Sequence, residues 1–295
     1  MVSAVATSIL NILSQGIFYC GCILELTGLV FLTREFLKKK SNFKTSYFII
    51  YCTCMVVNIF AIIIWLFANI AGGVFSIMDN LSMWYSLLFM GFWNILLSLN
   101  RFVAIVFPTK YDRVWNSTTL CISILLNSLF PFIANSYSFS NLYCKLYLFS
   151  DECFDYMRST MVFISISNIT QAIIAAVLGV ITAIYARSTL RKSKSTNMDK
   201  ILLIQATVTA FLLITASGIQ RYSLFIESQE ENLTDFLTYL MNFVLGIYHS
   251  FGVIFLIFMS PQFRTAYFTM FGIHQERTSR IQIMPTLAQN RVIHK

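Results

Sequence analysis

Charged side chains are scarce in this sequence. Only 12% of its 295 residues are Asp, Glu, Lys or Arg, while 57% are hydrophobic and the mean hydropathy is +0.70. Soluble domains carry about 25% charged residues. The composition therefore excludes an ordinary soluble globular protein.

Signatures of membrane enzymes, pigments and metalloproteins are also missing. No lysine lies between residues 201 and 263, where a retinal Schiff base would need one. The sequence has no paired aspartates, His–Glu set or Ser–His couple at membrane depth, and no paired CxxC motif for zinc. We therefore expect no enzymatic activity, no cofactor and no metal site. The internal repeats of many transporters are absent too, but a transporter or a ligand-gated channel subunit stays open as an alternative.

The segments without charge are long. Stretches of at least about 20 residues without Asp, Glu, Lys or Arg occur at 1–24, 45–78, 80–100, 114–144, 159–186, 201–220 and 236–263. A helix of that length crosses the hydrocarbon core, where backbone groups must bond internally. The alternating segments of a membrane barrel are absent. The pattern predicts an all-α membrane protein, a seven-transmembrane helix bundle.

The apolar pattern also gives approximate helix limits. We expect helices over 9–36, 46–70, 79–107, 118–137, 161–186, 201–225 and 236–259. Beyond the last of them, Pro261 can begin a further helix, with Phe263, Tyr267 and Phe268 on one side and Arg264 on the other. This stretch predicts a short amphipathic helix 8 in the membrane interface.

Lysine and arginine lie mostly on one side of the predicted membrane. Of the 21 basic residues, the opposite loops hold only Lys145, Arg158 and Arg221. The positive-inside rule predicts that the N-terminus is outside and the C-terminus in the cytoplasm. The net charge of +8 then reflects topology and contact with anionic lipid rather than nucleic-acid binding. We divide the chain into a membrane domain, 1–271, and a polar cytoplasmic tail, 272–295.

A single arginine marks the inner end of the third apolar segment. Arg101 follows the run 80–100 and precedes Pro108, so it lies where hydrocarbon meets water. An arginine at that depth is unfavourable unless it reaches the interface or a partner. In the simplest interpretation it reaches the interface, as most arginines at helix ends do.

The string around this arginine supports a second interpretation. Residues 100–111, N-R-F-V-A-I-V-F-P-T-K-Y, resemble the inner end of the third helix in rhodopsin-like G-protein-coupled receptors, D/E-R-Y-x-A-I-x-x-P-x-x-Y. The resemblance implies a receptor that binds a small extracellular ligand. It also implies activation of a heterotrimeric G protein through Asn100, Arg101, Phe107 and Pro108. Because Asn100 replaces the acid that usually pairs with the arginine, we expect Arg101 to be held less firmly in the resting state (a weaker resting lock). We therefore also expect some ligand-independent activity.

Other parts of the chain are similar to the nematode chemosensory receptors of serpentine receptor class x. The matching pieces are Ser46-Tyr47, Asn58, the loop pair Cys144 and Cys153, Gln205-Ala206, His249 and Phe263-Arg264. The C-W-x-P and N-P-x-x-Y motifs of most rhodopsin-like receptors are missing. The resemblance implies a chemosensory function in the plasma membrane of sensory neurons. Its partners would be membrane lipid, a G protein and a small molecule.

The upper part of the third helix holds candidate ligand contacts. Met83, Trp84 and Leu87 lie on or beside one face of this helix. The resemblance implies that this face lines a pocket among helices 3, 5, 6 and 7, although ordinary helix packing explains it equally well. Because helices 3, 5 and 7 show no buried charge there, we expect small neutral or hydrophobic ligands rather than amines.

Three polar side chains are expected at membrane depth: Glu25, Asn58 and His249. Such residues face the bundle interior and are candidates for function. One interpretation is a polar cluster that replaces the sodium site of rhodopsin-like receptors. The other is ordinary hydrogen bonding between helices.

The predicted outer loops hold candidates for covalent modification. Cys144 and Cys153 are the cysteines that face the oxidising side, so we predict a disulfide within the second outer loop. The sequons at Asn80 and Asn232 face the glycosylating side, and they are the candidate glycosylation sites.

Overall fold

The computed structural model describes residues 4–41, 43–148, 150–189, 197–226 and 231–273. Within these ranges, seven helices are long and apolar enough to cross a membrane. They are α1 (Ala4–Leu37), α2 (Ser46–Ala71), α3 (Val74–Val106), α5 (Ser117–Ala134), α7 (Phe154–Thr189), α8 (Asn197–Ile226) and α9 (Glu231–Met259). The described ranges contain no strand, and the prediction of an all-α seven-helix bundle is confirmed.

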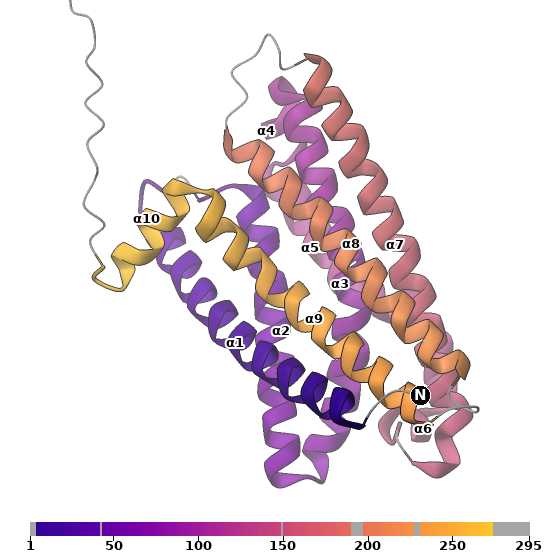
Figure 1. Ribbon diagram of the computed structural model, residues 1–295. Coiled ribbons are helices and arrows are strands. Elements are labelled where there is room, and N and C mark those ends of the chain that lie inside the picture. The colour runs from indigo at the N-terminus through magenta and orange to yellow at the C-terminus, as the bar shows by residue number, and fades with distance from the viewer. Residues whose placement is uncertain (1–3, 42, 149, 190–196, 227–230, 274–295) are drawn as a thin grey trace, which may run out of the picture.

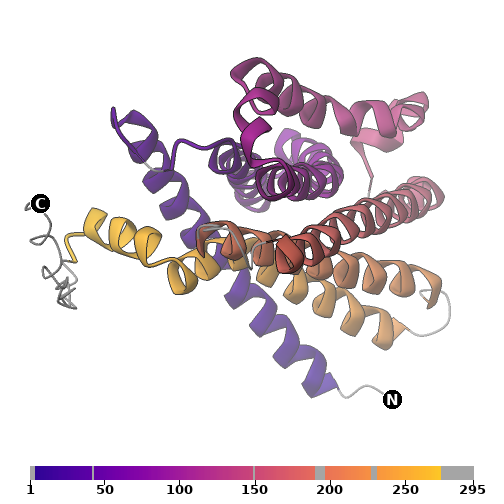
Figure 2. The same cartoon turned by 90° about the horizontal axis from the view of Figure 1, so that it is seen from above.

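The helix α3 lies at the centre of the bundle. It packs against α2, α5, α7 and α8, while α1 contacts α2 and α9, and α9 contacts α8. Figure 2 shows α5 on the outside of this arrangement. The most apolar window of α3 is accordingly 67% buried, against 17% in α5. A polar residue on α3 can therefore reach several helices at once.

Short helices complete the two ends of the bundle. They are η1 (Pro108–Lys110), α4 (Tyr111–Val114), η2 (Ser136–Ser140), α6 (Leu142–Leu146), η3 (Asp151–Cys153) and α10 (Pro261–Met270). Figure 1 places α6 at the same end as the N-terminus, and α4 and α10 at the opposite end. The predicted orientation assigns the first of these ends to the outside and the second to the cytoplasm.

The connection between α2 and α3 is shorter than the sequence predicted. Only Gly72 and Gly73 separate the two helices, with φ angles of +60° and +56°. Glycine adopts positive φ at no steric cost, which allows this abrupt reversal. The sequence had placed the start of the third helix near Asp79, because that is the first charge after a long apolar run. Asp79 instead lies inside α3.

Other predicted helix limits moved as well: α1 begins at Ala4 rather than at 9, and α8 at Asn197 rather than at 201. The helix α7 begins at Phe154 rather than near residue 161, and α9 begins at Glu231 rather than at 236. Charged residues mark where the hydrocarbon core ends, but a helix continues into the water as long as its backbone bonds allow. In the other direction, α5 stops at Ala134, and the predicted end near 137 falls in η2.

The predicted helix 8 is present as α10. Pro261 takes its first position and the Ser260 hydroxyl accepts a hydrogen bond from the Phe263 amide, which caps the helix start. The rings of Phe263 and Tyr267 are buried, and both pack edge-on against Phe31 of α1. The apolar stripe of α10 thus docks on the bundle itself.

The second outer loop contains the predicted disulfide. Cys144 in α6 and Cys153 in η3 are bonded, with their Cα atoms 5.3 Å apart. The Asn80 amide of α3 donates to the Leu146 carbonyl at 2.9 Å and so holds this loop against the bundle. Asn232 is exposed in the first turn of α9. The use of either sequon stays a prediction.

The disulfide gives a first testable prediction. Denatured, unreduced protein should react with a maleimide at five of its seven cysteines, and at all seven after reduction, as counted by intact mass. Labelling of all seven before reduction would contradict the bridge. In the control variant Cys153→Ser, every remaining cysteine should react without reduction. Because the bridge closes a loop of sequence separation 9, this variant should also lose about 2–3 kcal/mol of stability.

Candidate functional site

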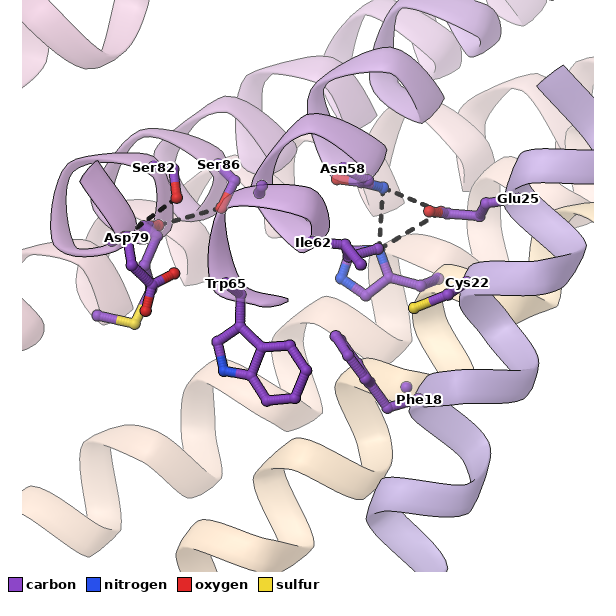
Figure 3. A pocket seen from close by; sticks show the side chains of 13 residues that line it. Phe18, Cys22, Glu25, Asn58, Ile62, Trp65, Asp79, Ser82 and Ser86 are labelled. Carbon is purple, nitrogen blue, oxygen red and sulfur yellow. Dashed lines mark hydrogen bonds and ion pairs between the residues drawn. The ribbon is translucent and has the colours of Figure 1, made fainter. Parts of the chain in front are cut away.

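Polar side chains from three helices meet inside the bundle. Asn58 Nδ2 on α2 lies 3.0 Å from Glu25 Oε1 on α1 and 2.9 Å from His249 Nδ1 on α9. The Glu25 and His249 atoms are themselves 3.6 Å apart. Glu25 and Asn58 are each only 4% exposed, and Figure 3 shows them pointing toward one another. The structure therefore brings all three predicted residues together, and we refer to them as the polar trio.

Glycines allow α1 and α9 to approach closely enough for this contact. A Cβ at Gly21 would lie 2.5 Å from Ser250 Oγ, and one at Gly246 would lie 2.8 Å from an Ile17 methyl carbon. Both distances are too short for real side chains, so larger residues would push the helices apart. Glu25 and Gly21 are one helical turn apart, and the close approach at Gly21 keeps the acid within reach of α9.

A cavity of about 370 Å³ opens beside the polar trio, between α1, α2, α3 and α9. Its volume lies within the range of about 300–1,000 Å³ that small-molecule pockets span. Figure 3 shows Phe18 and Trp65 near one another and Asp79, Ser82 and Ser86 together on the α3 side. The remaining lining residues are Cys22, Glu25, Asn58, Ala61, Ile62, Met83, Gly246 and His249. The sequence had placed the pocket among helices 3, 5, 6 and 7, whereas this cavity lies on the other side of α3.

Two acceptor atoms of the trio have no donor in the described structure. They are Glu25 Oε2 and Asn58 Oδ1, and both are buried. The hydroxyls of Ser82 and Ser86 donate to carbonyl oxygens of their own helix, at 3.0 and 3.1 Å. Both serines line the cavity, and a hydroxyl oxygen that donates can still accept a further hydrogen bond. An unpaired buried acceptor is unfavourable, so this wall is suited to a ligand that donates hydrogen bonds.

The three predicted pocket residues do not share one cavity. Met83 lines the cavity beside the trio, but Trp84 lines a separate apolar groove of about 490 Å³ between α2, α3 and α5. Leu87 packs into the core. Adjacent residues on a helix point about 100° apart, which separates Met83 from Trp84.

The Trp84 ring is covered by Lys145, which the sequence indicated only as a basic residue of the outer loop. The Lys145 Nζ lies 3.4 Å from the centre of the Trp84 ring and 5.2 Å from that of Phe139. The side chain is almost completely buried, and burial lowers the pKa of the Lys145 ammonium from 10.5 to about 7. Nothing in the local sequence signals this contact, because the disulfide loop creates it.

At the opposite end of α3, the Arg101 side chain is buried and only 3% exposed. Its guanidinium carbon lies 4.5 Å from the centre of the Tyr47 ring on α2, and its Nη2 donates to Asn100 Oδ1. The aromatic face stabilises the cation. The contact with Tyr47 was not predicted from the sequence, where only the replacement of the acid by Asn100 was apparent.

Asn100 connects this arginine to α2 and to the loop after α3. Its Nδ2 donates to Ser46 Oγ at 2.7 Å, and the Tyr111 hydroxyl lies 2.5 Å from the same Ser46 oxygen. Phe107 and Pro108 are exposed immediately beyond, at the end of α3 and in η1. Of the predicted coupling residues, Phe107 and Pro108 are thus exposed at the inner end of the bundle, whereas Asn100 and Arg101 are buried behind them.

A line of aromatic residues joins the arginine to the polar trio. Tyr47 stacks on Tyr51 one turn along α2, with ring centres 6.3 Å apart, and Tyr51 lies 5.8 Å from Trp93 of α3. Tyr51, Glu25 and Asn58 all line one small buried chamber. These aromatic contacts were not identified from the sequence, although the spacing of four between the tyrosines indicates a shared helix face.

Some predicted features lie outside the described residues. They are most of the basic third inner loop (190–196), part of the acidic outer loop (227–230) and most of the proposed tail (274–295). In the described part of the chain, no group of acids, histidines and cysteines could hold a metal ion.

Comparison with known proteins identifies the family. The model of the Srg family chemoreceptors matches residues 73–267, which run from the start of α3 into α10. No curated protein matches the sequence. The sequence resemblance had indicated serpentine receptor class x, whereas the matching family is class g. Both are chemosensory, and the match covers more than half of the chain. The protein is a multi-pass membrane protein that belongs to the Srg family of chemoreceptors.

Proposed function

We propose that this chain is a G-protein-coupled receptor in the plasma membrane of sensory neurons. A small extracellular ligand binds in the cavity beside the polar trio and activates a heterotrimeric G protein at the Arg101 end. The observation that carries the proposal is a series of side chains along α2, between the cavity and the inner end of the bundle. It runs from Glu25 and Asn58 through Tyr51 and Tyr47 to Arg101.

The mechanism follows from this series. A ligand that hydrogen-bonds to the trio favours one of two arrangements of α1, α2 and α9. A shift of α2 relative to α3 then moves the Tyr47 ring off the guanidinium. Arg101 turns toward the α subunit, next to Phe107 and Pro108. Ligand and G protein consequently raise each other's affinity by the same factor.

The coupling surface can be tested at the arginine. In membranes containing the full chain and a promiscuous G protein, Arg101→Gln should reduce basal nucleotide exchange at least about tenfold, because removing a charged hydrogen-bonding group costs about 1.5–3 kcal/mol. Arg34→Gln, at an exposed arginine of α1 on the same side of the membrane, should leave exchange unchanged at equal surface expression. Equal exchange in membranes with and without the chain would contradict the proposal. An ion current in place of exchange would favour a channel.

The replacement of the usual acid by Asn100 gives a separate prediction. Asn100→Asp places a carboxylate beside the guanidinium, which strengthens the resting state and should lower basal exchange about fivefold. Asn116→Asp is the matched control, since an aspartate there still caps α5. Unchanged basal exchange in Asn100→Asp would show that the resting lock does not depend on this position.

A further inference from the structure

Of the two acids that line the cavity, Glu25 and Asp79, Glu25 is the more deeply buried. Its Oε1 accepts from Asn58, but its Oε2 is buried without a hydrogen-bond donor. Asn58 Oδ1 is likewise buried without a hydrogen-bond donor. Both residues are more than nine-tenths buried and line the cavity. Both residues line the cavity, so a ligand group there with at least two donor hydrogens would satisfy their unpaired acceptors.

The charges around the cavity indicate the sign of that group. Among the lining residues, Glu25 and Asp79 are acids, and none is a lysine or an arginine. The one basic ring, His249, already contacts Glu25 and Asn58. A carboxylate or phosphate ligand would meet acceptors and negative charge without an arginine or lysine to pair with, whereas an ammonium would meet complementary partners.

The aromatic walls fit the remainder of such a molecule. Phe18 and Trp65 are in edge-to-face contact, with ring centres 5.4 Å apart, and both line the cavity. Aromatic faces attract cations and pack against hydrocarbon. Met83 and Ile62 add further apolar surface.

We propose that the ligand of this receptor is a small protonated amine. Its ammonium group donates to Glu25 Oε2 and Asn58 Oδ1, and its hydrocarbon part packs against Phe18 and Trp65. The inference deepens the proposed function and rests on the cavity being the ligand site. It reverses the expectation of neutral ligands, because that expectation considered helices 3, 5 and 7, whereas the acid comes from α1.

The test is thermal unfolding of the purified full-length protein at constant ionic strength. The probes are alkyl and aryl primary amines of roughly two to eight carbons, sizes that a cavity of this volume admits, each paired with the alcohol and the carboxylate of the same skeleton. At least one amine should raise the unfolding temperature, while its alcohol and carboxylate do not. This comparison needs no mutation and so does not depend on how a variant folds.

The variant Glu25→Gln should then require at least about tenfold more amine for the same shift, because a neutral amide replaces the charged acceptor. Glu35→Gln is the matched control. Glu35 is also a buried acid of α1, but it pairs with Lys38 and Ser41 far from the cavity, and its variant should respond to the amine as the natural protein does.

Three outcomes would overturn the amine proposal: no amine in the panel shifts unfolding, the alcohol or carboxylate shifts it equally, or Glu25→Gln responds unchanged. This readout is separate from signalling. An amine shift without any nucleotide exchange would contradict the proposed receptor function and leave the ligand class standing. Nucleotide exchange without an amine-induced shift in unfolding temperature would support the receptor function and contradict the amine as ligand class.

Discussion

The burial of Arg101 at the inner end of α3 requires the neighbouring side chains of α2 and α3 to stabilise its positive charge. Its guanidinium is almost completely removed from water, and it lies on the Tyr47 ring and donates to Asn100. Asn100 is in turn bonded to Ser46, which also contacts Tyr111 of α4. The Tyr47 ring of α2 and the Asn100 amide of α3 both stabilise the guanidinium, so the position of the arginine depends on how these two helices lie against each other. In the proposed function, the contact with Tyr47 is the one released during activation.

The buried acid Glu25 sets an equivalent constraint near the cavity. It is held by Asn58 of α2, the same helix that carries Tyr47 and Tyr51. These α2 residues share one face, and in the proposed function a rearrangement of the acid acts on the arginine through this helix. The central position of α3 completes this geometry, since α3 provides Arg101 at one end and part of the cavity wall at the other. The membership of a chemoreceptor family agrees with such a transmembrane link.

Much of the fold could be predicted because hydrophobic length and charge placement are local properties of the sequence. The seven spans and the bridge between Cys144 and Cys153 are confirmed. Of the candidate sites, the polar trio was found because ionisable residues such as Glu25 and His249 are unusual at membrane depth, and because Asn58 matched a polar position of the resembling receptors. The contacts of Tyr51, Trp93 and Lys145 were missed, since they depend on which helix faces meet and on how the disulfide loop folds back. An aromatic residue in an apolar segment carries no signal that separates such a contact from ordinary packing.

The central claim is that the cavity and the Arg101 end are coupled through Tyr47. The coupling can be measured without a ligand, because Cys22 lines the cavity. The measurement is the rate at which Cys22 is alkylated, with and without bound nucleotide-free G protein, read by peptide mass spectrometry. The account predicts that G protein changes the rate at least about fivefold, the lower end of usual coupling. It also predicts that Tyr47→Leu abolishes the change, while Tyr222→Leu, at an exposed tyrosine of α8, retains it. A Cys22 rate that is indifferent to G protein, or a change that persists in Tyr47→Leu, would contradict the account.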